Sequence, residues 1–244
     1  DGDMLALLRS GERGLAAVRR LLAQLDATVR DAGSEPWRHD FDRVTLLAPV
    51  PRPGKILCSG INYAGHLEEN PKAVLPKEPF FFAKMPSTVV GHRAAIRRPP
   101  QTTQLDYEVE LAVVIGRRMS RTSEADAMKA VAGYTILHDV SARDVQFKDN
   151  QITLGKNFDT FCPMGPCLVT ADEIPHPDGL GLRAFVNGER RQDGSTRDWI
   201  FPLPKLLSFL SSVMTLEPGD VVSTGTPAGV GLFQQPPSFL NPGD

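Results

Sequence analysis

Cysteine is scarce in this chain, and its spacing is not that of a metal site. The three cysteines are Cys58, Cys162 and Cys167. An odd number of cysteines without close pairs does not form a disulfide framework, so the pattern favours a reducing compartment over an oxidising one. We therefore expect a cytoplasmic protein, or an organelle-matrix protein from which a targeting segment has been removed.

An excess of charge of one sign and a long apolar run are also missing. Lys and Arg number 27 against 29 Asp and Glu, which gives a net charge of −2. This balance provides neither a basic footprint for nucleic acid nor a polybasic surface for anionic lipid. No apolar run approaches the ~20 residues that cross a bilayer. The first residues do not have a signal-peptide pattern. We expect no nucleic-acid partner and no membrane association.

Apolar residues make up 41% of the chain, and their spacing divides it in two. Residues 3–30 carry Leu and Val at intervals of three or four, which predicts a helical pair that is interrupted near Gly11 and Gly14. We therefore expect an N-terminal helical arm at 1–43, as part of an N-terminal region, and a catalytic domain at 44–244. The turn-like final residues usually lead into another strand, so we expect C-terminal strands of this domain to be missing.

Strand signals dominate the larger region, where Pro and Gly recur too often for long helices. Short helices are predicted at 123–131, with Ser123 as the cap, and at 204–213. The dipeptide Asn187-Gly188 between two strand-like runs predicts a hairpin. No internal repeat or low-complexity tract is present. The pattern predicts a strand-rich, mixed α+β fold.

Two glutamates stand two residues apart in a segment with the composition of a buried strand. Side chains alternate along a strand, so Glu108 and Glu110 point to one side, and Val109, Leu111 and Val113 point to the other. Two carboxylates in one apolar-walled space repel each other unless a cation lies between them. A divalent ion that prefers oxygen ligands is the simplest such cation. An edge strand with two solvated glutamates is the alternative that this segment leaves open.

A third carboxylate, Asp139, follows a strand predicted at 133–138. Together with Glu108 and Glu110 it would form a three-carboxylate face for Mg²⁺, with Mn²⁺ and Ca²⁺ as further candidates. A turn or cap aspartate is the other interpretation of Asp139. In a short helix, His66 and Glu69 would share a face, which is the arrangement of a general base oriented by a carboxylate. A surface histidine beside an acidic neighbour is the alternative there.

Two loops contain further polar candidates. Lys156, in the segment GKNFDT at 155–160, is not part of a Walker loop, and it is placed to neutralise a developing oxyanion. A glycine-rich loop at 223–231 contains Thr226, whose hydroxyl and neighbouring N–H groups suit a carboxylate ligand. A surface lysine and a structural turn are the alternatives. The combination of these signals decides between the interpretations.

These segments resemble the fumarylacetoacetate hydrolase superfamily, in the family's order, over about 44–244. The matching motifs are GINY at 60–63 with His66 and Glu69, DYEVE at 106–110, HDVSARDVQ at 138–146, GKNFDTF at 155–161 and TGTP at 224–227. The runs PKEP at 76–79 and GLF at 231–233, with PP at 236–237, are similar to the subgroup of fumarylacetoacetate hydrolase domain-containing protein 2.

The resemblance implies a fold of several mixed β-sheet layers with few short helices, and a homodimer. It implies a metal ion held by Glu108, Glu110 and Asp139, catalytic roles for His66, Glu69 and Lys156, and substrate contacts from Gln146 and Thr226. Thr160 matches a position that supports the metal shell in some members. Ser59 stands where the mammalian fumarylacetoacetate enzyme has a fourth acidic ligand, which counts against fumarylacetoacetate as the substrate.

The implied substrates are small 2-oxo acids with a second carbonyl, and the implied reaction is hydrolysis of a carbon–carbon bond in acylpyruvate or fumarylpyruvate through a metal-bound enolate. An oxaloacetate keto–enol tautomerase is the alternative, with a 2-hydroxymuconate-type isomerase or oxaloacetate decarboxylase beside it. All of these reactions share the enolate, so the metal motif does not separate them. A non-catalytic, metal-stabilised binding module is a more remote hypothesis.

Overall fold

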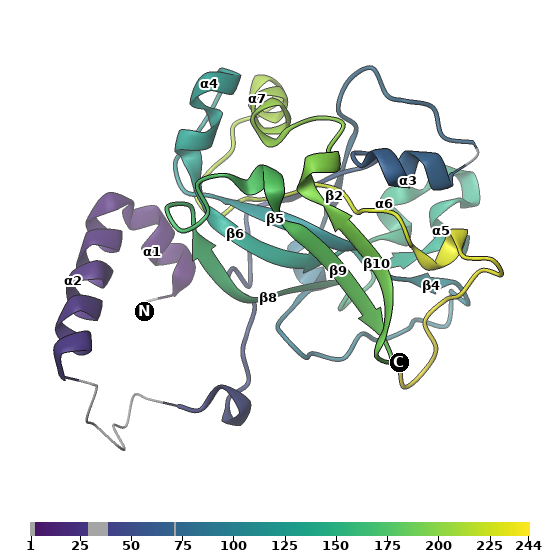
Figure 1. The fold of residues 1–244 in the computed structure, drawn as a ribbon, viewed down its shortest axis with the longest axis horizontal. Helices are drawn as coiled ribbons and strands as arrows, with labels where there is room; N and C mark the ends of the chain where they lie inside the picture. The colour runs from purple at the N-terminus through teal and green to yellow at the C-terminus, as the bar shows by residue number, and fades with distance from the viewer. Residues whose placement is uncertain (1–2, 29–38, 71) are drawn as a thin grey trace.

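A computed structural model describes residues 3–28, 39–70 and 72–244 of the chain (Figure 1). The last two positions of the helical pair predicted at 3–30 lie outside the described residues, and so does the part 31–38 of the segment before the predicted domain boundary. Within the described part, the break predicted near Gly11 is confirmed, because α1 (Met4–Ser10) ends there and α2 (Glu12–Thr28) begins beyond it.

The centre of the molecule is a mixed seven-stranded sheet with the order β2-β1-β11-β5-β6-β8-β3. Its strands are β1 (Ile56–Ser59), β2 (Phe81–Lys84), β3 (Val89–Val90), β5 (Val109–Ile115), β6 (Val131–His138), β8 (Cys162–Thr170) and β11 (Val221–Ser223). The pairs β1–β11 and β3–β8 are parallel, and the other neighbours are antiparallel. Two small sheets pair β4 (Leu105–Asp106) with β7 (Ser141–Ala142) and β9 (Gly181–Val186) with β10 (Glu189–Ser195). The predicted α+β, strand-rich class is confirmed.

The helices are short and lie around this sheet. Besides the N-terminal pair they are α3 (Ala64–Glu69), α4 (Glu124–Ala127), α5 (Arg143–Gln146), α6 (Ile152–Gly155) and α7 (Leu203–Val213). The 3-10 turns are η2 (Phe41–Arg43), η3 (Pro86–Thr88), η4 (Met128–Ala130), η5 (Lys148–Asn150), η6 (Pro177–Gly179), η7 (Thr196–Asp198) and η8 (Gly231–Phe233). The predicted hairpin is confirmed: Asn187 and Gly188, both at positive φ, join β9 to β10.

The helix predicted at 123–131 is shorter than expected. It ends at Ala127 and tightens into η4, and the β-branched Val131 already belongs to β6. Ser123 occupies the N-cap position, but its hydroxyl bonds the Asp126 carboxylate instead of a backbone N–H. This local bond competes with the cap that the composition predicted.

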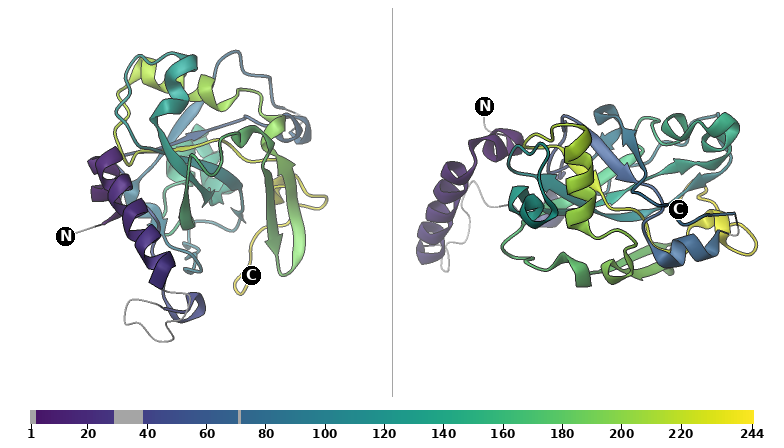
Figure 2. Two further views of the ribbon diagram at one scale, coloured as in Figure 1. Left: turned by 60° about the vertical axis from the view of Figure 1, so that its left-hand side comes forward. Right: turned by 90° about the horizontal axis from the view of Figure 1, so that it is seen from above.

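Each face of the central sheet packs against different elements (Figures 1 and 2). One face carries α4, α7 and β9, and Val109, Leu111 and Val113 of β5 are buried there, as their alternation predicts. The opposite face is covered by the segment around Val50 and by α1, whose Leu8 is buried in the same cluster as the sheet residues. Among the described residues, no helix has the length and hydropathy of a bilayer-spanning segment.

Candidate active site

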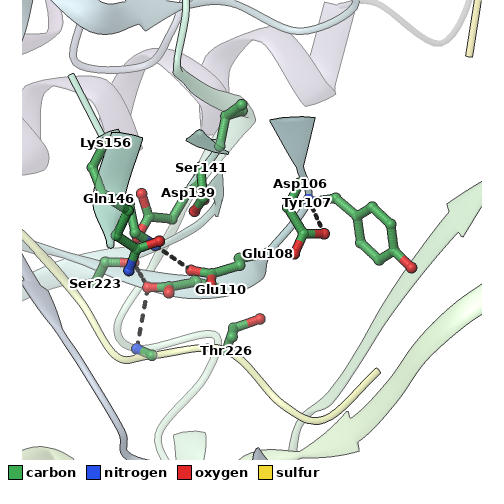
Figure 3. A network of polar contacts seen from close by, with 12 residues as sticks. Asp106, Tyr107, Glu108, Glu110, Asp139, Ser141, Gln146, Lys156, Ser223 and Thr226 are labelled. Atoms are coloured by element: carbon green, nitrogen blue, oxygen red, sulfur yellow. Dashed lines mark hydrogen bonds and ion pairs between the residues drawn. The ribbon is translucent and has the colours of Figure 1, made fainter. Parts of the chain in front are cut away.

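Three buried carboxylates meet at the end of the strand pair β5–β6 (Figure 3). Val109 pairs with His138 in this antiparallel ladder, so Glu108, just before β5, and Asp139, just after β6, are neighbours. The backbone N–H of Asp139 donates to the Glu108 carbonyl at 2.9 Å. Glu110 follows Glu108 by two residues, and its side chain points to the same side of the strand. One carboxylate oxygen from each of Glu108, Glu110 and Asp139 lies within 4.8 Å of the other two.

Two lysines neutralise part of this cluster. The Lys156 ammonium lies 2.6 Å from Glu108 Oε2 and 2.8 Å from Asp139 Oδ2, and that of Lys84 lies 2.6 Å from Asp139 Oδ1. Burial alone lowers the pKa of Lys156, but attraction to Asp139 and Glu108 outweighs it and raises the pKa to about 12. Between these two carboxylates Lys156 is an ammonium at neutral pH.

Arg143 completes the cationic side of the cluster. Its Nη2 lies 2.7 Å from Glu108 Oε1, and its Nε donates to Asp106 Oδ2 at 2.8 Å. Burial raises the pKa of Glu108, but the charges of Lys156 and Arg143 outweigh this effect and hold the pKa well below its usual range. Glu108 is thus an ionised carboxylate with a cation on each oxygen.

The environment of Glu110 shifts its pKa in the opposite direction from that of Glu108. Its Oε2 accepts hydrogen bonds from the Ser223 hydroxyl and from Gly225 N–H, the latter at 3.1 Å. Within the described ranges it forms no ion pair. Burial, followed by repulsion from Asp139 and Glu108, raises its pKa well above the usual value. A proton or a cation must therefore compensate the charge of this carboxylate.

The donor set fits a divalent ion that prefers oxygen ligands. The four buried carboxylates of Asp106, Glu108, Glu110 and Asp139 face the three buried cations of Lys84, Arg143 and Lys156, which leaves one negative charge uncompensated. That charge is centred on Glu110, beside oxygens of Glu108 and Asp139. Carboxylate oxygens at this spacing suit Mg²⁺, Mn²⁺ or Ca²⁺, and the arrangement does not select among them.

A histidine–carboxylate pair on α3 is the second part of the candidate site. His66 Nδ1 and Glu69 Oε1 are 2.6 Å apart within α3, and Gly229 N–H donates to Glu69 Oε2 at 2.8 Å. The Phe233 ring packs against the imidazole with a centroid distance of 6.0 Å. Glu69 therefore holds the ring through Nδ1 and leaves Nε2 available to a ligand.

One cavity of about 200 Å³ joins the two halves of the site. Six of the sequence-predicted residues line it, namely His66, Glu108, Glu110, Gln146, Lys156 and Thr226. Glu69 and Asp139 contribute from behind that wall, through His66 and Lys156. The mouth is apolar, since Phe80 and Phe147 are exposed there. The structure therefore brings all eight predicted residues into one site.

The predicted substrate contacts already have protein partners. Gln146 Oε1 accepts from Arg143 Nη1 at 3.1 Å, and the Thr226 hydroxyl donates to the Val109 carbonyl at 3.0 Å. Thr226 also accepts from the Gln192 amide at 2.8 Å. Thr160 does not line this cavity; its hydroxyl accepts from the Arg97 N–H at 2.8 Å.

Sequence reasoning assigned no role to Lys84 or Gln192. Lys84 follows three apolar residues of β2 and is fully buried, and a charged residue ending so apolar a strand is a signal for a buried partner. Gln192 is fully buried in β10 and bonds the Val109 N–H, Thr226 and the Pro227 carbonyl. Nothing in its sequence context distinguishes it from an exposed hairpin residue.

Comparison with known proteins identifies the family of the chain. Residues 55–244 match the family described as fumarylacetoacetate (FAA) hydrolase C-terminal. A bovine protein, oxaloacetate tautomerase FAHD2B, mitochondrial, is 47% identical over 244 residues, which cover 99% of this chain and 74% of the relative. Oxaloacetate tautomerase YisK of Bacillus subtilis is 44% identical over 246 residues, which cover 100% of this chain and 81% of the relative.

Solved structures show the same fold. The fumarylacetoacetate hydrolase of Exiguobacterium antarcticum superposes with a TM-score of 0.76 at 43% identity and covers 83% of this chain and 73% of that one. A 5-carboxymethyl-2-hydroxymuconate delta-isomerase of Mycobacterium smegmatis gives 0.71 at 41% identity and covers 79% and 73%. The chain therefore belongs to the fumarylacetoacetate hydrolase superfamily, in the subgroup similar to fumarylacetoacetate hydrolase domain-containing protein 2.

Proposed function

We propose that this protein is a divalent-metal-dependent enzyme that interconverts the keto and enol forms of oxaloacetate. The observation that carries the proposal is that relatives named oxaloacetate tautomerase match 99–100% of the chain at 44–47% identity. The sequence alone placed carbon–carbon hydrolysis first. The comparisons support its stated alternative better, because a mammalian and a bacterial relative carry the tautomerase name.

The size of the cavity agrees with a small acid. A volume of about 200 Å³ lies below the 300–1,000 Å³ typical of pockets for drug-sized ligands. A four-carbon 2-oxo diacid is compact enough for such a space. Its two carboxylates need compensating charge, which the ammonium of Lys156 and a cation at the carboxylate cluster would supply on one wall.

The reaction requires charge to develop on the C2 oxygen while a proton moves at C3. When bound by Glu108, Glu110 and Asp139, the divalent ion supplies Lewis acidity toward the 2-oxo group. Lys156 keeps its proton, so its role is to stabilise negative charge on that oxygen electrostatically. Gln146, which lines the same cavity and accepts from Arg143 only through its amide oxygen, orients the acid through its amide N–H groups, and Thr226 shapes the cavity lining.

The His66–Glu69 pair is the group suited to move the proton. In the keto-to-enol direction, His66 Nε2 takes a proton from C3, the electron pair of the C–H bond forms the C2–C3 double bond, the π electrons of the C2 carbonyl move to its oxygen, and the protonated imidazole returns the proton to that oxygen. The reverse steps give the ketone. Glu69, fixed by Gly229 N–H, holds the imidazole in the tautomer that presents Nε2 to the cavity.

Two substrates test the assignment with Mg²⁺ present. Enol-oxaloacetate should ketonise faster with the enzyme than in buffer, with its carbon skeleton intact by proton NMR, and His66→Ala should remove most of the gain. Acetylpyruvate should remain uncleaved. Acetate and pyruvate from acetylpyruvate, without accelerated ketonisation, would establish the hydrolase instead, and pyruvate and carbon dioxide from oxaloacetate would establish a decarboxylase.

Mg²⁺ as the resident ion and a homodimer as the assembly are part of the same proposal. The oxygen donor set supports a hard ion, and the family resemblance supports the dimer. Metal analysis of the purified protein and light scattering on a sizing column test these two statements. A protein that melts higher with Mg²⁺ but does not respond to oxalate would instead support the binding-module hypothesis.

A further inference from the structure

Within the part of the chain that the structure describes, one hydroxyl group of the cavity lining has no partner. Ser59, at the end of β1, is 2% exposed and lines the cavity together with Glu110, His66 and Lys156. Its Oγ makes no hydrogen bond to any of the described residues. A buried hydroxyl that stays unbonded loses its hydration without compensation, so this position favours a ligand that accepts its hydrogen.

The other hydroxyl of the cavity lining is already used, since Thr226 donates to the Val109 carbonyl. Ser59 also lies on the side of the cavity that holds Glu110. The loop residue Gly225, whose N–H bonds Glu110, approaches Ser59 so closely that a Cβ on it would lie 3.6 Å from the Ser59 carbonyl oxygen. The Ser59 backbone is therefore close to the loop that bonds Glu110, and Ser59 and Glu110 line the same cavity.

We propose that Ser59 is a substrate-binding residue whose hydroxyl donates a hydrogen bond to an oxygen of the 2-oxo acid end of the ligand. The class of ligand rests on the proposed function. A neutral donor suits an anion here, because the cluster already has four carboxylates against three cations, and a further carboxylate would repel the acid. Hydrogen bonds to an anionic acceptor are the stronger kind, so the contact contributes measurably to affinity.

Oxalate binding measured by calorimetry at saturating Mg²⁺ tests the contact without turnover. Ser59→Ala should weaken oxalate about tenfold, which corresponds to about 1.4 kcal/mol. The matched control is Thr135→Val: Thr135 is 4% exposed, its Oγ1 also lacks a partner among the described residues, and it does not line the cavity. The control should bind oxalate like wild type, and circular dichroism verifies the fold of both variants.

Each outcome has a distinct meaning. Unchanged oxalate affinity in Ser59→Ala overturns the inference. An equal loss of Mn²⁺ affinity without oxalate also overturns it, because Ser59 would then support the ion and not the acid. Wild-type protein that binds Mg²⁺ but not oxalate would overturn the proposed substrate class, which is a separate result. Oxalate binding that depends on Ser59, in an enzyme that does not ketonise oxaloacetate, would leave this inference standing and reject the tautomerase.

Discussion

At the scale of a single residue, the carboxylate of Glu110 in the candidate site lowers the stability of the folded protein at neutral pH. Its charge is opposed by burial and by Asp139 and Glu108, which raise its pKa, and among the described residues its hydrogen bonds come from neutral donors. A group whose pKa is raised on folding stabilises the folded state at low pH, and that contribution is lost as the pH rises through the raised value. The metal-free protein is therefore destabilised at neutral pH by the carboxylate that would bind the proposed ion.

We expect Glu110→Gln to raise the Tm of the metal-free protein at neutral pH and to abolish binding of Mg²⁺. The amide keeps an oxygen for Ser223 and Gly225 but carries no charge. Thermal melts in EDTA across pH 5 to 8 check this, and the gain over wild type should shrink toward the acid end. In Mg²⁺ the order should reverse, since only wild type gains ligand stabilisation. Parallel pH dependences of wild type and variant in EDTA would contradict the assignment.

Lys156 contributes in the opposite direction, because its charge competes with a metal ion for Glu108 and Asp139. We expect Lys156→Met to bind Mg²⁺ more tightly than wild type and to lose at least ~10²-fold in kcat, the scale of removing one oxyanion-stabilising donor. Titration calorimetry and steady-state rates check the two effects separately. A variant that loses affinity and turnover together would contradict an electrostatic role in catalysis.

Much of the site was predictable at this scale, for physical reasons. The period of two along a strand places Glu108 and Glu110 together without any knowledge of the fold. Asp139 and His66 were candidates from their sequence context, but one carboxylate or one histidine has many structural explanations, and the family resemblance favoured the functional one. Gln192 was not predictable at all, because its burial depends on where the β9–β10 hairpin packs.

At the scale of elements, the loop from Thr226 to Phe233 connects the two halves of the site. Asp106 accepts from the N–H groups of Gly231 and Leu232 at 2.7 and 3.0 Å, and Gln192 holds Thr226 and Pro227. Between these anchors, Gly229 has a φ of 105° and donates to Glu69. The loop therefore fixes the position of the His66–Glu69 pair relative to β5 and β10.

Replacement of the buried anchor in β10 should disturb catalysis from a distance. We expect Gln192→Leu to lower kcat about tenfold through Glu69, while Mg²⁺ affinity remains within about twofold, because Gln192 bonds the backbone N–H of Val109 between Glu108 and Glu110 and none of the three carboxylates; the scale is that of about 1.4 kcal/mol in the barrier. Arg190→Gln, an exposed change on the same strand, is the control. Equal losses of kcat and Mg²⁺ affinity would show general unfolding of the loop.

The elements themselves were predicted unequally. The hairpin turn and the strand at 109–115 follow from local chemistry, and both were confirmed. The order of the strands in the sheet does not follow from local chemistry. Strand β1 pairs with β11, which lies more than half the chain away in sequence, and such a contact depends on how the intervening segments pack. The predicted end of the helix at 123–131 was wrong, because the β-branched Val131 belongs to strand β6.

At the scale of the whole molecule, the N-terminal helices pack on the central sheet through α1 and leave much of α2 exposed. The sequence predicts an arm at 1–43 beside a domain at 44–244. In the structure, α1 buries Leu8 against the sheet, whereas Leu22 of α2 is 55% exposed. Ion pairs join Arg19 to Asp172 at 3.1 Å and Arg117 to Glu12 at 2.8 Å, but such exposed pairs contribute little.

The burial of Leu8 makes α1 part of the main cooperative unit, which a pair of alanine variants can test. We expect Leu8→Ala to lower the free energy of unfolding of the single main transition by about 2–4 kcal/mol, the usual cost of a leucine removed from a packed core. Leu22→Ala on exposed α2 should change it by less than about 0.5 kcal/mol. Urea unfolding followed by tryptophan fluorescence suits this measurement, because Trp199 packs against the buried cluster on the face opposite α1. If Leu8→Ala left that transition unchanged, the arm would be an independent unit that ends before the catalytic domain, and its docking on the sheet would contribute nothing to the stability of the site.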